Sequence, residues 1–336
     1  MSTNEERRQE AKRKLEQRLS DQEQAARKRK LIIGGSLGTV ALVAIIGFGT
    51  WGLISYNNSQ YNKNHARCAY EPTAAYPDVN QLLTQANQQA DQAQQSGQAT
   101  AEQAQQYKDS QAKQADVLRQ HAGLAKPVAK PSQSRPSKKG TTTVALDTTQ
   151  GTITMDLKAA EAPCNVNALK TLVKEKFYDN SPCHRLVSNP QMAVLQCGDP
   201  TGTGSGTPGW TSPDEFPTNL KAAPGDGGAN GYVVYPRGTI AIANSYQPAN
   251  PMSGQPSSGQ NTGSSQFFLV INDTTLPQNY SIVGHVDPAS LAVLDKIKAG
   301  GINPPVIATP QADPSQPITD GQPKLPVTIT TATIAK

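Results

Sequence analysis

The C-terminal part of this 336-residue sequence predicts a mainly β fold, a closed β-barrel that carries two helices. Many short apolar and β-branched runs follow Gly140, and Gly/Pro-rich turns separate them. A further observation concerns the other end of the chain, where residues 31–55 contain no charged side chain. We therefore expect one transmembrane helix, followed by a helical or disordered spacer, to precede the barrel.

Residues 1–30 form a basic head, in which ten Lys and Arg face six acids and leave a net charge of +4. Residues 31–55 are long enough, as a helix, to cross a hydrocarbon core of about 30 Å. A cleaved signal peptide is the alternative, but its apolar region would span only about 7–15 residues. We expect a single-pass cell-membrane protein, anchored in lipid through residues 31–55, with a cytoplasmic N-terminus. A basic head beside an anchor favours lipid, not nucleic acid, as its partner.

Residues 56–140 are predicted to be an extracytoplasmic linker with an Ala/Gln-rich helical spacer. Ala and Gln dominate residues 80–126 and favour helix, but Gly97 interrupts them and the apolar stripe is thin. A solvated helix, a weak coiled coil and partial disorder all fit this composition, and the oligomeric state stays open. The Pro-rich basic run 126–140 marks the start of the last domain, residues 141–336.

The four cysteines are Cys68, Cys164, Cys183 and Cys197. Outside a cell membrane, an even number of cysteines permits two disulfides in three possible pairings. Buried free thiols are the alternative for some of them. The sequence leaves the pairing open.

Within residues 141–336, strand and helix signals alternate with turns. Two β-branched runs flank Thr149-Gln150-Gly151 and predict a hairpin. Apolar residues at helical spacing after Pro163, and again in PASLAVLDKIKAG, predict two helices. Further strands are expected in HRLV, MAVLQC, GTIAIAN, SQFFLVI, SIVGHV and PVTITTATI.

The stretch CHRLVSNPQMAVLQCGDPTGTGSGTPGW, residues 183–210, suggests three kinds of chemistry that its context argues against. Its G-x-G-x-x-G spacing is followed by WTSPDEFPTN, whose prolines argue against the helix that a dinucleotide site needs. The cysteines and the four scattered histidines lack metal-ligand spacing. Cysteines in strand-like runs also lack the setting of a catalytic thiol. We therefore predict no cofactor and no metal site.

Arg185 and Gln196 remain, on neighbouring predicted strands, and the motifs around them resemble a known family. The motifs are FYDNSPCHRLV, VLQCGDPTGTGSGTPGW, YPRGTIAIAN, NTGSSQFFLVI and LPQNYSIVGHV. In order and spacing they resemble those of the cyclophilin-type peptidyl-prolyl cis-trans isomerases, over about residues 143–336. The resemblance implies an eight-stranded antiparallel cyclophilin-like barrel with two capping helices, and an enzyme acting on proline-containing polypeptides. The anchor and the cysteine placement are similar to the membrane-anchored actinobacterial branch, which works outside the membrane.

The resemblance also implies the site residues. The catalytic residues would be Arg185, Gln196 and Phe268. The substrate-binding residues would be Val194, Ala243, Asn244, Gln266, Leu276 and Tyr280. Amide resonance sets a barrier of about 18–20 kcal/mol to X-Pro rotation. An apolar pocket for the proline ring and an Arg N–H that binds the twisted amide would lower it without covalent chemistry.

Three positions depart from the family pattern. Ala193 stands where the family has a pocket phenylalanine, Thr275 where it has a tryptophan, and Tyr280 where it has a histidine. We expect a wider pocket and weaker cyclosporin binding from these changes. They also support an alternative function, a catalytically weak, membrane-tethered proline-peptide binding module or chaperone.

Overall fold

The computed structural model describes residues 8–14, 16–25, 27, 55–225, 231–249, 254–306 and 316–335. The chain divides into two units, residues 1–63 and 64–336. The predicted transmembrane segment, residues 31–55, lies outside the described residues except for its last position. Within the described part, no helix is both long and apolar enough to cross a membrane. The anchor therefore stays a prediction. In the first unit, the described residues 8–14, 16–25 and 55–63 are helical.

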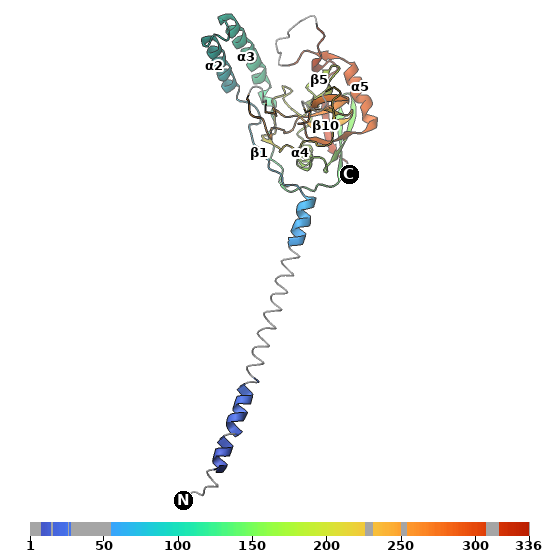
Figure 1. The fold of residues 1–336 in the computed structure, drawn as a ribbon. Coiled ribbons are helices and arrows are strands. Elements are labelled where there is room, and N and C mark those ends of the chain that lie inside the picture. Colours follow the sequence, from blue (N-terminus) through green and yellow to red (C-terminus); the bar gives the residue numbers. More distant parts are fainter. Residues whose placement is uncertain are drawn as a thin grey trace. The chain divides into compact units, whose positions relative to one another are not determined.

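The second unit is built on one antiparallel sheet that curves round on itself (Figure 1). In spatial order its strands are β14 (Ile302–Asn303), β15 (Asp320–Pro323), β5 (Arg185–Ser188), β6 (Ala193–Cys197), β11 (Phe267–Asn272), β10 (Thr239–Ile242), β13 (Ile282–Val286), β3 (Gly151–Lys158), β2 (Thr141–Thr148), β16 (Thr328–Ile334) and β4 (Ser181–Pro182). Strands β4 and β5 are separated by only two residues in the chain. In the spatial order, however, β4 is the last strand and β5 is the third. The sheet therefore returns to the segment from which it started.

The mainly β fold is confirmed, but the expected count of eight strands is wrong, because the described sheet has eleven. Cys183 and His184 divide one extended segment into β4 and β5. The short strands β14 and β15 come from GINPP and TDGQP, which show no apolar alternation. Polar strands of two to four residues carry no periodic signal that could be recognised in the sequence.

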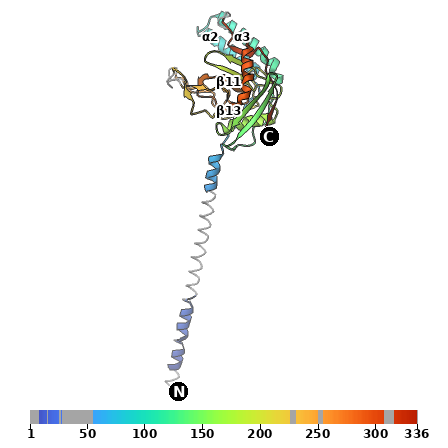
Figure 2. The same cartoon turned by 90° about the vertical axis from the view of Figure 1, so that its right-hand side faces the viewer.

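The predicted hairpin and both predicted helices are confirmed. Strands β2 and β3 pair in register from Thr141↔Lys158 to Thr148↔Gly151. Helix α4 spans Pro163–Lys174, and its proline occupies the first turn, where a missing N–H costs least. Helix α5 (Leu291–Ala299) follows a short 3₁₀ turn, η2 (Pro288–Ser290). Both α4 and α5 contribute side chains to the main buried core, which also includes residues of β11 and β13 (strands labelled in Figure 2).

Alternation along the strands divides the sheet into an inner and an outer face. On the three strands β5, β6 and β11, the inner positions include Leu186, Leu195 and Leu269, which are fully buried in the main core. Phe267 is also in this core, as its position next to Phe268 predicts. The outer face is covered by a three-stranded sheet in the order β12 (Thr274–Pro277), β9 (Tyr232–Tyr235) and β8 (Lys221–Ala222).

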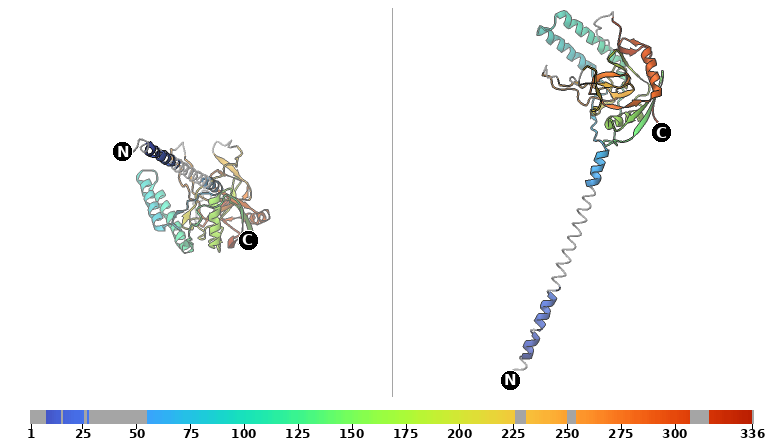
Figure 3. Two further views of the ribbon diagram at one scale, coloured as in Figure 1. Left: turned by 90° about the horizontal axis from the view of Figure 1, so that it is seen from below. Right: turned by 45° about the vertical axis from the view of Figure 1, so that its right-hand side comes forward.

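The Ala/Gln-rich segment is a helical hairpin. Helices α2 (Val79–Gln95) and α3 (Ala101–His121) lie side by side and antiparallel, joined by a turn that contains Gly97 (Figure 3). The Asp78 side chain caps α2, and Thr100 begins α3 with a capping box. A single 3₁₀ turn, η1 (Ala122–Leu124), ends the segment.

The segments on either side of the hairpin are tied to the barrel. Strand β1 (Glu71–Pro72) pairs with β7 (Trp210–Thr211). The disulfide Cys68–Cys164 links the chain before the hairpin to helix α4, and Cys183–Cys197 links the β4–β5 segment to β6. The disulfides therefore use all four cysteines. This pairing decides among the three alternatives that the sequence allowed.

Candidate functional site

Three predicted catalytic residues lie on one row of cross-strand neighbours on the outer face of the sheet. The register pairs Arg185 with Gln196, Gln196 with Phe268, and Phe268 with Ala241. Directly opposed residues share a face, so these side chains form a line across β5, β6, β11 and β10. Since neighbouring strands are about 4.8 Å apart, the backbones of Arg185 and Phe268 are separated by roughly 10 Å.

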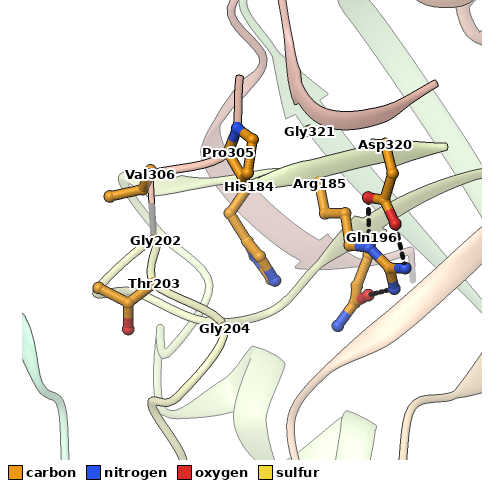
Figure 4. Close-up of a pocket in the computed structure, with 10 residues that line it drawn as sticks. All are labelled: His184, Arg185, Gln196, Gly202, Thr203, Gly204, Pro305, Val306, Asp320 and Gly321. Atoms are coloured by element: carbon orange, nitrogen blue, oxygen red, sulfur yellow. Dashed lines mark hydrogen bonds and ion pairs between the residues drawn. The ribbon is translucent and has the colours of Figure 1, made fainter. Parts of the chain in front are cut away.

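The Arg185 guanidinium is held by two partners (Figure 4). Its Nε and Nη2 donate to the two carboxylate oxygens of Asp320, at 2.8 and 2.6 Å. Its Nη1 donates to Gln196 Oε1 at 3.2 Å. The hydrogen bond to Asp320 raises the pKa of Arg185, so this group is a permanent cation with a fixed orientation.

Gln196 forms a hydrogen bond with Gln266 as well as with Arg185. Its Nε2 donates to Gln266 Oε1 at 2.9 Å, and Gln266 Nε2 donates to the backbone carbonyls of Gly204 and Gly206. Each amide therefore has a defined orientation. The predicted substrate-binding residue Gln266 supports Gln196 in this arrangement.

The loop that receives Gln266 is wrapped around the buried carboxylate of Asp199. This carboxylate accepts hydrogen bonds from the backbone N–H of Thr201, Gly204 and Gly206. A Cβ on Gly206 would lie 2.1 Å from Asp199 Oδ1, so only glycine fits there. The glycine spacing thus serves a carboxylate-centred turn. Trp210 begins strand β7, at the place where a dinucleotide-type turn would be followed by a helix.

His184 lies between this loop and Arg185 (Figure 4). Both ring nitrogens are buried, and among the described residues neither has a hydrogen-bond partner. The pKa of His184 is lowered to about 4, chiefly by burial; the Asp199 carboxylate opposes this shift and the Arg185 cation contributes to it. The imidazole is therefore neutral at physiological pH.

A cavity of about 320 Å³ opens beside Arg185. Its lining consists of His184, Arg185, Gln196, Gly202, Thr203, Gly204, Pro305, Val306, Asp320 and Gly321. Two charged groups, Arg185 and Asp320, face it and neutralise each other. The predicted apolar residues of the proline pocket are not part of this lining.

Those apolar residues lie farther along the outer face, in a second buried cluster. Its buried members are Val187, Val194, Val233, Tyr235, Ala241, Phe268, Val270 and Ile282. Met192, Leu220, Ala243, Leu276 and Tyr280 pack against it. The structure thus brings the predicted residues Val194, Phe268 and Leu276 together. Ala193, in contrast, belongs to the inner core, and Met192 is the neighbour that faces the outer cluster.

This placement corrects one expectation. A small residue at position 193 was expected to widen the proline pocket, but Ala193 faces the barrel interior and cannot do so. A bulge between Val270 and Asn272 shifts the register at this end of β6, and Ala193 pairs with Asn272. At the second departure, Thr275 donates its backbone N–H to the Gln191 carbonyl and pairs with Val234 in the covering sheet.

Tyr280 packs edge-on against Phe268, with ring centroids 5.4 Å apart and an interplanar angle of 84°. Its backbone N–H donates to the Tyr235 hydroxyl, whose own proton points to the Pro277 carbonyl. Burial raises the pKa of Tyr280, and Arg185 lowers it in part. Phe268 is only 4% exposed as a result of this packing. Tyr280 therefore forms one side of the outer apolar cluster, where the resemblance predicts a hollow for the proline ring.

The predicted backbone contacts fall beside this hollow. The Ala243 N–H donates to the Gln266 carbonyl, which removes it from any role in substrate binding. Asn244 donates its side-chain amide to the Asn279 carbonyl at 2.7 Å. This leaves the main chain of Asn244 as the better candidate for holding a substrate backbone.

Sequence reasoning missed Asp320 and His184. Asp320 follows Arg185 by 135 positions and reaches it because β15 pairs with β5, where Asp320 lies opposite Val187. The surrounding TDGQP has no feature beyond a turn. His184 directly precedes Arg185 in the chain. This adjacency was the one signal in the sequence that could have placed His184 at the site.

Comparison with known proteins gives a consistent assignment. Residues 143–334 match the family model described as cyclophilin type peptidyl-prolyl cis-trans isomerase/CLD. A probable peptidyl-prolyl cis-trans isomerase B of Mycobacterium leprae is 41% identical over 179 residues, covering 53% of this chain and 56% of that protein. Its Mycobacterium tuberculosis counterpart is 40% identical over 178 residues, covering 53% of each. The chain thus spans about half the length of these relatives.

Two further similarities cover most of the other protein. A peptidyl-prolyl cis-trans isomerase of Helicobacter pylori is 33% identical over 167 residues, which make up 49% of this chain and 86% of that protein. A crystal structure of a Cryptosporidium parvum cyclophilin-type isomerase aligns with a TM-score of 0.40 at 21% identity. It covers 59% of this chain and 99% of that one.

Proposed function

Because the chain belongs to the cyclophilin-type peptidyl-prolyl cis-trans isomerase family, we propose that it accelerates rotation about X-Pro bonds in polypeptides. The observation that carries this proposal is the row Arg185–Gln196–Phe268. It places a fixed cation and an aromatic wall on one face, with a hydrogen-bonding amide between them.

The chemistry follows from the donors that Arg185 retains. A guanidinium has five N–H groups, and three are engaged with Asp320 and Gln196. Nη1 and Nη2 each keep a second N–H that these bonds do not use. When the amide twists, the prolyl nitrogen regains a lone pair and can accept one of these hydrogens. A planar amide offers no such acceptor, so the interaction stabilises the transition state selectively.

The apolar part of the outer face supplies the second contribution. The proline ring would rest against Phe268 and Tyr280, with the twisting bond above Gln196. A separation of roughly 10 Å between the backbones of Arg185 and Phe268 leaves room for one residue. Removing water from the amide also favours the twisted, less dipolar form.

We propose that this activity is directed at polypeptides outside the cell membrane. The uncharged run 31–55 behind a basic head supports a single-pass anchor with a cytoplasmic N-terminus. The two disulfides support an oxidising compartment for residues 64–336. The cysteine placement also supports the membrane-anchored actinobacterial branch.

The second candidate is a tethered proline-peptide holder without appreciable catalysis. The observation in its favour is the packing of Tyr280 on Phe268, which leaves the latter 4% exposed. If that ring blocks the hollow, a substrate proline could rest beside it without reaching Arg185.

A protease-coupled assay on a proline tetrapeptide, using the full chain, separates the two candidates. We expect catalysis by the native chain and a loss of about 100-fold or more in kcat for Arg185→Ala. Arg185→Lys tests geometry, because Lys cannot form the two-pronged contact with Asp320. An unchanged rate in Arg185→Ala would contradict the proposed mechanism. Peptide binding without any rate enhancement by the native chain would establish the holder.

A further inference from the structure

The helical hairpin carries a groove of about 250 Å³ between α2 and α3. Its floor contains buried residues, among them Leu118, which is 4% exposed. Its rim presents Leu82 and Tyr107, which are 44% and 40% exposed. Two large, partly exposed apolar side chains therefore lie at one groove whose lining surface is mostly polar.

The polar lining of this groove consists of amides. Gln85, Gln89 and Gln111 contribute to it, and none of its lining side chains carries a charge. A glutamine amide can both donate and accept hydrogen bonds, and so can a peptide group. Apolar side chains beside uncharged amides match the chemistry of an extended polypeptide, whose backbone amides alternate with side chains.

The groove and the cavity of the candidate isomerase site are both lined by one short loop, residues 202–205. Gly202, Thr203 and Gly204 line the cavity beside Arg185, and Ser205 lines the groove. Two residues next to the helical hairpin or at its end, Tyr76 and His121, contact this loop segment. The Tyr76 hydroxyl lies 3.5 Å from Thr203 Oγ1, and His121 Nδ1 lies 2.6 Å from the Thr201 carbonyl. The two hollows therefore lie on either side of residues 202–205.

We propose that the α2–α3 groove binds an uncharged, unfolded segment of the same client polypeptide whose proline lies at Arg185. The inference rests on the proposed isomerase function. A client that crosses the 202–205 loop would occupy both hollows at once. Binding at the groove then raises the local concentration of prolines at the catalytic row, independently of the sequence around each proline.

The test compares two double variants of α2 that change charge equally. Gln85→Glu with Gln89→Glu places two carboxylates in the groove. Gln88→Glu with Gln92→Glu makes the same change at exposed positions that do not line it. Each pair has i, i+4 spacing, so the cost to the helix is matched. Both are made in the full chain.

Three measurements are made on each variant. The first is kcat/KM on a proline tetrapeptide, and the second is catalysis of a refolding reaction whose rate is limited by proline isomerisation, that of a reduced, carboxymethylated ribonuclease. The third is binding of a labelled, uncharged peptide without proline. For the groove pair we expect unchanged tetrapeptide activity. We also expect KM for the refolding chain to rise about fivefold or more, with a matching loss of peptide binding. Gln85 and Gln89 are exposed in the free chain, so a bound peptide would cover the new carboxylates and remove their hydration. The control pair should behave as the native chain.

Equal behaviour of the two variants in refolding and in peptide binding would overturn the proposal. The tetrapeptide result reports separately on the proposed function. If the native chain fails on the tetrapeptide but the groove pair still loses peptide binding, the groove is supported and the isomerase assignment fails. Leu82→Ser provides a neutral check, since it should weaken peptide binding without adding charge.

Discussion

The Asp320 carboxylate accepts a hydrogen bond from the Arg185 guanidinium on each of its oxygens. Oδ1 lies 2.8 Å from Nε, and Oδ2 lies 2.6 Å from Nη2. The two side chains are 49% and 40% exposed, so this ion pair contributes little to stability. Its effect is on orientation. The pair fixes the plane of the guanidinium and restrains the rotation of a long side chain.

Replacing this carboxylate should reduce turnover more than it reduces stability. For Asp320→Ala we expect kcat on a proline tetrapeptide to fall about tenfold, with KM changed less, because a misplaced guanidinium meets the twisted amide less often. Asp320→Asn should recover part of the loss, since its amide oxygen can still accept one N–H. The control is Asp295→Asn, because Asp295 forms an equivalent two-pronged pair with Arg237. An equal loss in that variant would contradict a positioning role for Asp320.

Tyr280 should act as a wall of the apolar hollow, not as a plug. Tyr280→Phe keeps the ring against Phe268, so we expect KM to stay within about twofold of the native value. Tyr280→Ala removes the wall and should raise KM about threefold to tenfold. Steady-state kinetics on a tetrapeptide series provides the measurement. A fall in KM for Tyr280→Ala would show that the ring obstructs the hollow and would favour the holder function.

The two disulfides should differ in their contribution to stability, because they close loops of different lengths. Cys68–Cys164 joins positions 96 residues apart, and Cys183–Cys197 joins positions 14 apart. Chain entropy predicts losses of about 4–5 and about 3 kcal/mol when each pair is changed to Ala. Urea unfolding of each double variant measures them. The shorter disulfide lies beside Arg185 and Gln196, so only its removal should also lower kcat. The opposite order of stabilities would contradict the entropic account.

His184 should make the stability of the fold depend on pH below neutrality. Burial lowers its pKa to about 4 in the folded state, from an ordinary value near 6.5 in the unfolded state. The unfolded state therefore binds more protons between these values, and stability falls as the pH drops from about 6.5 to 4. Each pKa unit corresponds to about 1.4 kcal/mol. We expect His184→Gln to flatten this part of the unfolding profile, measured by urea titration at several pH values. A parallel profile in the variant would show that other groups cause the dependence.

The barrel strands and both helices could be predicted because each carries a local signal. Short, nearly continuous apolar runs mark β6 and β11, and Pro163 with its helical spacing marks α4. The extra strands could not be predicted in this way, since β14 and β15 are short and polar. In the Ala/Gln-rich segment, helix propensity was visible, but its folding into a hairpin depends on contacts such as Tyr76 to Leu118.

The sequence by itself determined the family, the catalytic Arg–Gln–Phe candidates and the opposite facing of the neighbours Phe267 and Phe268. These follow from motif order and from the two-residue period of a strand, which are properties of neighbouring positions. Only the tertiary structure decided which cysteines pair, that Met192 and not Ala193 faces the hollow, and that Asp320 holds Arg185. Each of these depends on strand register between segments far apart in the chain, and a shift of one residue would reverse every face.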